Sequence, residues 1–141
     1  MANNNGLTNK AVYDLIDRQL AVWQQASDNF SALANVGVKE VTVGGFPVKV
    51  QFNPARIVSS AAKVDPKTIK ERKCFLCGAN RPAIQEGLPF VGKKMEYSVL
   101  INPFPIFPKH LTVPDVTHVN QTIEGEYERF EDMLTLPETL D

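Results

Sequence analysis

The sequence predicts an α+β fold with a long N-terminal helix, a mainly antiparallel sheet and a C-terminal helix. Two observations carry this prediction. Apolar residues recur at helical spacing near both ends of the chain, whereas the middle alternates apolar and polar residues between glycine and proline breaks. A chain of 141 residues has the length of one domain. We therefore expect residues 1–141 to form a single domain, with a flexible tail over residues 1–7.

The first helix is predicted from about residue 10 to residue 34. Thr8 precedes it and can cap its N-terminus through its hydroxyl. Apolar residues then recur at mostly three- and four-residue spacing, which gives one helical face that can pack on a sheet. This face contains Val12, Leu15, Ile16, Leu20, Trp23, Ala26 and Phe30. We expect Trp23 to belong to the core.

Two alternating runs flank Gly44-Gly45 and predict a β-hairpin over residues 38–43 and 46–52. Further strands are predicted over residues 96–101 and 110–113, joined by a segment that three prolines keep extended. A second amphipathic helix is predicted from about residue 125 to 136, ending at Pro137. Its expected inner face contains Ile123, Tyr127, Phe130, Met133 and Leu134, and acidic residues form the outer face.

The composition excludes several classes of function. A formal net charge of −1 gives no electrostatic basis for binding nucleic acid. No apolar run reaches the roughly 18 residues of a membrane span, and the polar N-terminus lacks the layout of a signal peptide. We therefore expect a cytoplasmic protein with neither a nucleic-acid nor a membrane partner.

The two cysteines and two histidines of the chain all lie within one third of it. Cys74 and Cys77 form a Cys-x-x-Cys pair, whose tight turn can bring both sulfur atoms to one zinc ion. On residues alone, His110 or His118 could supply a third ligand, and the other histidine or Asp115 a fourth. Two other interpretations stay open: a pair of buried unliganded cysteines, or a redox thiol pair that forms a reversible disulfide without metal.

The proline-rich segment from Asn102 to His110 suggests a rigid binding loop. Asn102 ends a predicted strand, so its amide is held in place and could hydrogen-bond ribose hydroxyls, and a stiff loop loses little entropy on binding. His110, read alone, is a structural residue that braces the loop. Arg56 and Lys63 follow the hairpin and could face a phosphate, although on the residues alone a solvated loop or edge strand is the favoured interpretation.

This order of motifs resembles the histidine-triad (HIT) superfamily. A strand, Asn-Pro-x-Pro-x-x-Pro-x-His, an apolar strand and Pro-x-x-x-His are similar to the branch of galactose-1-phosphate uridylyltransferase, diadenosine tetraphosphate phosphorylase and GDP-L-galactose phosphorylase. Several lineages carry a zinc-binding Cys-x-x-Cys where Cys74 and Cys77 stand. Residues 53–63 also resemble the uridylyltransferase segment from Asn-Pro to a basic pair. The resemblance covers about residues 46–120.

The resemblance implies a role for each candidate residue. Zinc would be a structural cofactor, and its ligands would be Cys74, Cys77 and His118. Asn102 would contact the ribose, and Arg56 and Lys63 would approach the phosphates of a nucleoside phosphate or nucleotide sugar. His110 would occupy the structural position that closes the loop.

The chain departs from the family at the catalytic motif. Family members carry a His-x-His-x-His or His-x-His-x-Gln strand whose central histidine attacks the α-phosphorus, and their fourth zinc ligand comes from the same part, yet no histidine follows His118 here. We therefore expect an N-terminal part of a HIT-like nucleotidyltransferase or phosphorylase, inactive alone because nucleophilic catalysis needs its nucleophile. Its incomplete sheet should form a homodimer or associate with the missing C-terminal part. The alternative is a small zinc-stapled binding or scaffold module without catalysis.

Overall fold

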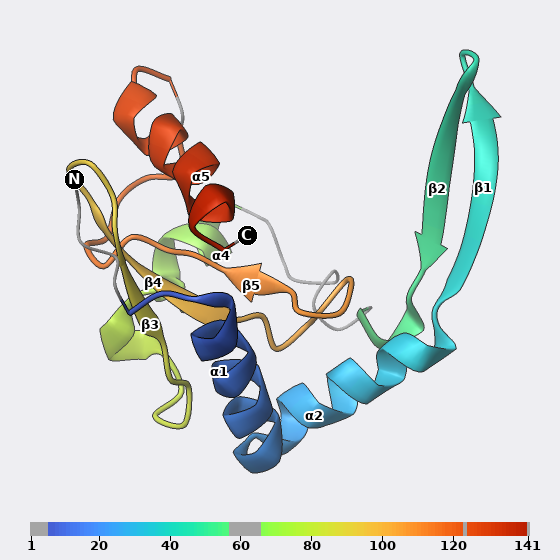
Figure 1. The fold of residues 1–141 in the computed structure, drawn as a ribbon, viewed down its shortest axis with the longest axis horizontal. Coiled ribbons are helices and arrows are strands. Elements are labelled where there is room, and N and C mark those ends of the chain that lie inside the picture. The colour runs from blue at the N-terminus through green and yellow to red at the C-terminus, as the bar shows by residue number, and fades with distance from the viewer. Residues whose placement is uncertain (1–5, 57–65, 123, 141) are drawn as a thin grey trace.

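The computed structural model describes residues 6–56, 66–122 and 124–140, without the side chains of residues 68–70, and its fold is α+β as predicted (Figure 1). No helix in these ranges is long and apolar enough to cross a membrane. The helices are α1 (Asn9–Val22), α2 (Gln24–Ser31), η1 (Ala32–Asn35), η2 (Pro54–Arg56), α4 (Pro66–Glu71), η3 (Gly78–Asn80) and α5 (Tyr127–Thr139), the η helices being of the 3-10 type. The strands are β1 (Gly37–Val43), β2 (Phe46–Phe52), β3 (Leu88–Val91), β4 (Glu96–Ile101) and β5 (Leu111–Thr112).

The single long helix predicted at the N-terminus is wrong, because the chain forms two helices that meet at Trp23. Thr8 caps α1 as expected, its Oγ1 accepting the N–H of Ala11 at 3.1 Å. Trp23 then adopts an extended conformation (φ −109°, ψ 91°), and α2 leaves α1 at an angle (Figure 1). The turned helix brings Asn29 to the proline-rich loop, where its Nδ2 donates to the carbonyl of Pro103 at 2.8 Å. The hydrogen bond between α2 and the loop therefore accompanies the change of helix direction at Trp23.

The core lies between α1 and the three-stranded antiparallel sheet, whose strand order is β3-β4-β5. Leu15, Val99 and Ile101 are fully buried, and Trp23 packs against them partly buried. Leu7 is also buried in this core, so the predicted flexible tail does not extend to it; residues 1–5 lie outside the described residues.

The predicted hairpin is present, but it forms a two-stranded sheet of its own. Gly44 (φ 58°) and Gly45 (φ 85°) make the turn, in which positive φ at both positions matches the twist of the strands. β1 and β2 pair antiparallel, with Val43 opposite Phe46. The hairpin projects away from the remaining elements (Figure 1), and nearly all of its residues are exposed.

The C-terminal helix is present, but the prediction of its inner face is wrong. Tyr127, Phe130, Met133 and Leu134 are 52–80% exposed, whereas Arg129 and Asp132 are buried. Hydrogen bonding explains this orientation: Asp132 Oδ2 accepts from the hydroxyl of buried Tyr97 at 2.9 Å. The predicted inner residue Ile123 lies outside the described residues. Arg129 and Asp132 therefore lie on the inner side of α5 together with Leu136, which packs against the core, while the predicted apolar residues face outward.

The predicted ends of this helix differ as well. α5 begins at Tyr127 rather than residue 125, and it continues through Pro137 to Thr139. Pro137 lacks an N–H and therefore cannot donate to the carbonyl one turn before it. The last turn persists because the N–H of Leu140 bonds to the carbonyls of Leu136 and Pro137 at 3.2 and 3.1 Å.

Candidate metal centre

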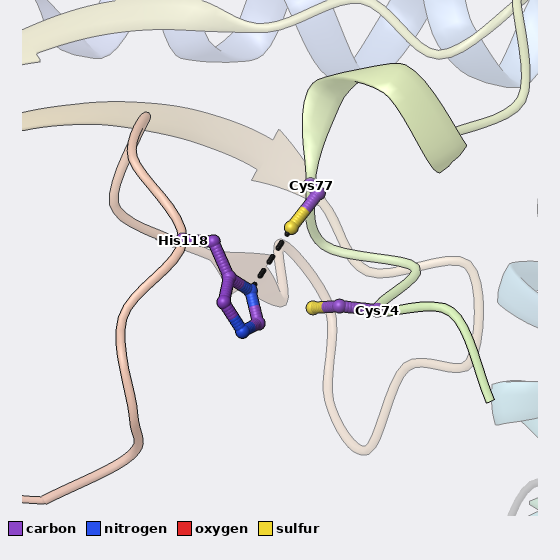
Figure 2. Close-up of side chains that lie close together, drawn as sticks. All are labelled: Cys74, Cys77 and His118. Carbon is purple, nitrogen blue, oxygen red and sulfur yellow. Dashed lines mark hydrogen bonds between the residues drawn. The ribbon is translucent and has the colours of Figure 1, made fainter. Parts of the chain in front are cut away.

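Cys74, Cys77 and His118 lie together, and their sulfur and ring nitrogen atoms are all within 4.8 Å of one another. Figure 2 shows both sulfur atoms directed toward the imidazole ring, with Cys77 Sγ 3.1 Å from His118 Nδ1. Zinc bonded at about 2.3 Å to sulfur and about 2.0 Å to nitrogen in a tetrahedron places its ligand atoms roughly 3.5–3.8 Å apart. Small side-chain adjustments would therefore let the three atoms hold one metal ion.

A tight turn positions the two cysteines. The N–H of Cys77 bonds to the carbonyl of Cys74 at 3.3 Å, and the N–H of Asn80 bonds to the carbonyl of Cys77 at 2.9 Å. Asn80 Nδ2 also donates to the carbonyl of Cys74 at 2.9 Å. This role of Asn80 was not predicted from the sequence, although asparagine commonly bonds to nearby backbone groups in turns.

The two thiols differ in acidity. A hydrogen bond from the backbone of Leu76 lowers the pKa of Cys74, and the backbone of Cys77 and the charge of Arg72 act in the same direction. Loss of hydration raises the pKa of Cys77, and the neighbouring Cys74 raises it further. Cys74 is therefore the first of the pair to become a thiolate, which is the form that binds metal.

His118 lies close to the cysteines because the segment before it is hydrogen-bonded to β4. The N–H of Ser98 bonds to the carbonyl of Pro114 at 3.0 Å, and the N–H of Val116 bonds to the carbonyl of Glu96 at 2.8 Å. Asp115, considered as a further ligand from the sequence, instead lies 3.5 Å from the guanidinium of Arg129.

A hollow of about 420 Å³ adjoins His118. Its walls combine apolar side chains with the buried side chain of Arg129, which lies 3.5 Å from Asp115 and 3.7 Å from Glu126. Both separations exceed normal hydrogen-bond length. The lining residues are Met95, His118, Val119, Asn120, Thr122, Glu126 and Arg129.

The loop from Asn102 to His110 is closed by its own two ends. The N–H of Asn102 bonds to the carbonyl of His110 at 2.9 Å, and Asn102 Oδ1 accepts the N–H of Phe104 at 2.9 Å. His110 Nδ1 accepts the N–H of Ile106 at 3.2 Å, and its ring packs on Phe107 with centroids 4.7 Å apart. Burial lowers the pKa of His110, and the charge of Arg56 lowers it further. The neutral imidazole that accepts this hydrogen bond is therefore favoured.

Three side-chain amides outside the loop also hold it. Besides Asn29, Gln51 Nε2 donates to the carbonyl of Ile106 at 2.7 Å and Asn53 Nδ2 to that of Pro105 at 3.4 Å. These donors come from α2, from β2 and from the residue after β2. None of the three was predicted from the sequence, in which the one available signal is that a proline-rich loop has few N–H groups of its own to donate.

Arg56 lies beside this loop, which is the position expected of a residue that faces the phosphate of a ligand bound there. It lines a narrow crevice together with Phe104 and Pro105, and its Nε is buried without a hydrogen-bond partner among the described residues. Lys63, predicted as its companion, lies outside the described residues. The structure thus brings Arg56 to the loop and describes nothing of Lys63.

The chain matches the family model of a domain of unknown function, DUF4922, over residues 15–141. No curated protein and no solved structure gives a significant match. The site is therefore interpreted from its own chemistry.

Proposed function

The chain belongs to the DUF4922 family, and from its residues we propose that it is a zinc-binding protein that also binds a nucleoside phosphate. In this proposal Cys74, Cys77 and His118 hold a structural zinc ion. The loop that starts at Asn102 and the nearby Arg56 contact the nucleotide. The polypeptide corresponds to an N-terminal part of a HIT-like nucleotidyltransferase or phosphorylase and does not transfer the nucleotide by itself.

The convergence of three soft ligand atoms is the observation that carries the proposal. Cys74 and Cys77 lie 41 or more positions before His118 in the sequence, yet their ligand atoms lie within 4.8 Å. Thiolate and imidazole ligands in a tetrahedral arrangement favour zinc over magnesium or calcium, which prefer oxygen ligands. Bound zinc would tie the Cys-x-x-Cys turn to the segment after β5, and water, a carboxylate or another chain would supply the fourth ligand.

The rigidity of the loop supports the nucleotide part of the proposal. Three amide side chains and His110 fix its carbonyl and N–H groups before any ligand arrives. A preorganised loop loses little conformational entropy on binding. Arg56 adds a permanent positive charge next to the loop, with an Nε that lacks a partner among the described residues, and a guanidinium suits a phosphate.

The absence of turnover follows from the histidines. His118 would be a zinc ligand, and His110 uses its Nδ1 to accept the N–H of Ile106. No third histidine exists in the chain to attack a phosphorus atom. Nucleotide transfer by the purified protein would contradict this part of the proposal.

The first test is the zinc content of the purified protein by elemental analysis. We expect about one zinc per chain, lost in Cys74→Ser, because one thiolate and one imidazole bind zinc far more weakly than the full set. Phe75→Ser is the matched control, since this exposed residue lies in the same turn and offers no ligand. Protein without zinc, or Cys74→Ser with undiminished zinc, would refute the metal site.

A second candidate function is a zinc-stapled scaffold that recruits a partner without binding a nucleotide. The observation that favours it is the large apolar surface exposed on the β1–β2 hairpin and α5. Thermal unfolding with and without nucleoside diphosphates and nucleotide sugars separates the two functions. Nucleotide binding predicts a stabilisation that Arg56→Gln reduces and that Arg18→Gln, on the exposed side of α1, leaves unchanged. A scaffold predicts no nucleotide effect in any of these proteins.

A further inference from the structure

One face of the β1–β2 hairpin is apolar and exposed. Residues that pair across an antiparallel ladder point to the same side, so the pairs Val43–Phe46, Val41–Val48 and Lys39–Val50 share a face with Phe52, the partner of Gly37. Five of these side chains are 40–74% exposed and are called the hairpin face here: Val43, Phe46, Val48, Val50 and Phe52. The opposite face pairs Glu40 with Lys49 and Thr42 with Pro47.

A second exposed apolar surface lies on α5. Tyr127, Phe130 and Leu134 follow at helical spacing on one side of the helix, and Met133 adjoins them. Their exposed fractions are 80%, 52%, 56% and 55% for Tyr127, Phe130, Leu134 and Met133. These four residues are called the α5 face. It is turned away from the core because Asp132, on the other side of the helix, bonds to Tyr97.

The two faces cannot cover each other within one chain. The hairpin and α5 lie at opposite ends of the molecule (Figure 1). A two-stranded hairpin is marginally stable in water unless its apolar face is covered. Within residues 6–56, 66–122 and 124–140 neither face is covered, so each face is available to a surface from another chain.

We propose that a second copy of the chain supplies it, in a two-fold symmetric dimer in which each hairpin face packs on the partner's α5 face. A buried aromatic side chain contributes about 150–250 Å², and a buried aliphatic one roughly 60–120 Å². Scaled by the exposed fractions, the two faces together offer roughly 800 Å² per copy, the area of a standard protein–protein interface. Neither face alone reaches this area, and the reciprocal arrangement buries both.

The charges around the faces are complementary. Lys39 is the one charged residue whose ladder position falls on the apolar side of the hairpin. The α5 face is bordered along the helix by exposed Glu138 and by exposed Glu131, whose carboxylate also pairs with Lys93 of the same chain. Packing hairpin on α5 therefore brings Lys39 toward carboxylates, whereas packing hairpin on hairpin brings two Lys39 side chains together. Charge complementarity of this kind favours one orientation over others.

Sedimentation velocity on the full chain tests the dimer. We expect a mass twice the 15.7 kDa of one chain at micromolar concentration. The dissociation constant of the dimer should rise at least tenfold in Phe46→Ser and in Phe130→Ser. Thr42→Ala, on the opposite hairpin face, and Thr135→Ala, beside the α5 face, are the matched controls and should sediment as the unmodified protein. Circular dichroism verifies that each variant is folded, and both target residues are exposed.

Mixing the two interface variants distinguishes the reciprocal dimer from other pairings. A Phe46→Ser chain retains its α5 face and a Phe130→Ser chain retains its hairpin face, so their mixture recovers one complete contact. In the proposed dimer Phe46 and Phe130 share one contact, so substituting both there costs less than the sum of the single losses, and we expect the mixture to dimerise more tightly than either variant alone. Failure of the mixture to recover, a dimer insensitive to both substitutions, or a single-chain mass for the unmodified protein at tens of micromolar would overturn the proposal. The last result would assign the two faces to a different protein.

Discussion

Replacing Gly92 with alanine should strongly destabilise the protein, because the turn between β3 and β4 has no space for a methyl group. A Cβ at this position would lie 2.1 Å from Asp132 Oδ2 and 2.3 Å from its Cγ. The carboxyl group of Asp132 is buried, so it can relieve this overlap only by leaving its site. The substitution therefore tests whether Asp132 anchors α5 to the sheet.

The expected loss follows from the two hydrogen bonds that this displacement breaks. Asp132 Oδ2 accepts from the Tyr97 hydroxyl at 2.9 Å, and Oδ1 accepts from the N–H of Lys93 at 2.8 Å. Hydrogen bonds to a carboxylate contribute about 1.5–3 kcal/mol each, whereas Gly→Ala stabilises by about 0.4–1 kcal/mol through the unfolded chain. We expect a net loss of about 2–5 kcal/mol in the free energy of unfolding, a large part of the roughly 5–15 kcal/mol of a typical domain.

Urea denaturation of a double-mutant cycle provides the assay. Gly92→Ala should lower the urea midpoint by about 1–3 M, while Gly6→Ala, where a Cβ meets nothing within 4 Å, should leave it unchanged. In an Asp132→Ala background the added Gly92→Ala should cost almost nothing, because the obstructing carboxyl group is gone. Additive losses in the cycle, or a midpoint for Gly92→Ala equal to that of the unmodified protein, would refute the steric explanation.

Three further predictions concern the loop, the hairpin and the metal. Burial and Arg56 lower the pKa of His110 in the folded protein, so the unfolded chain takes up the proton first as pH falls. The unmodified protein should therefore lose stability as pH falls below about 6.5. His110→Gln should make this loss of stability smaller. Gly45→Ala, at φ 85°, should speed hydrogen exchange of the hairpin amides about tenfold, because a left-handed L-residue costs about 1–2 kcal/mol. Gly44→Asn should leave exchange unchanged, since Asn-Gly suits this turn. Zinc at a hundred times its dissociation constant should stabilise by about 2.7 kcal/mol and raise the melting temperature by roughly 10 °C, an effect absent from Cys74→Ser.

Elements defined by local chemistry could be predicted from the sequence. The Gly44-Gly45 turn requires positive φ at both positions, and the strands around it alternate as a hairpin does. The strand predicted over residues 96–101 is β4 with the same bounds. The convergence of Cys74 and Cys77 with His118 was also predicted, although the residues alone left His110 open as the third ligand and the family resemblance implied His118.

Features set by contacts between distant segments could not be predicted. The break at Trp23 has no proline or glycine to mark it, and it accompanies a contact between Asn29 and a carbonyl 74 residues away. The strand β3 is short and contains Pro89, which weakens its alternating pattern. The amides that hold the proline-rich loop become recognisable only once the fold has brought Gln51 and Asn53 next to it.

The orientation of α5 shows why apolar periodicity alone misled the prediction. A helix normally buries its apolar stripe, and that rule placed Tyr127 and Phe130 inside. The rule assumes that the covering surface belongs to the same chain. Here the hydrogen-bonded carboxylate of Asp132 and the buried guanidinium of Arg129 occupy the inner side with Leu136, so Tyr127 and Phe130 face outward. A helix that carries both buried polar residues and an exposed apolar stripe therefore makes two contacts. The polar residues orient the helix within the chain, and the apolar stripe can bind a second surface.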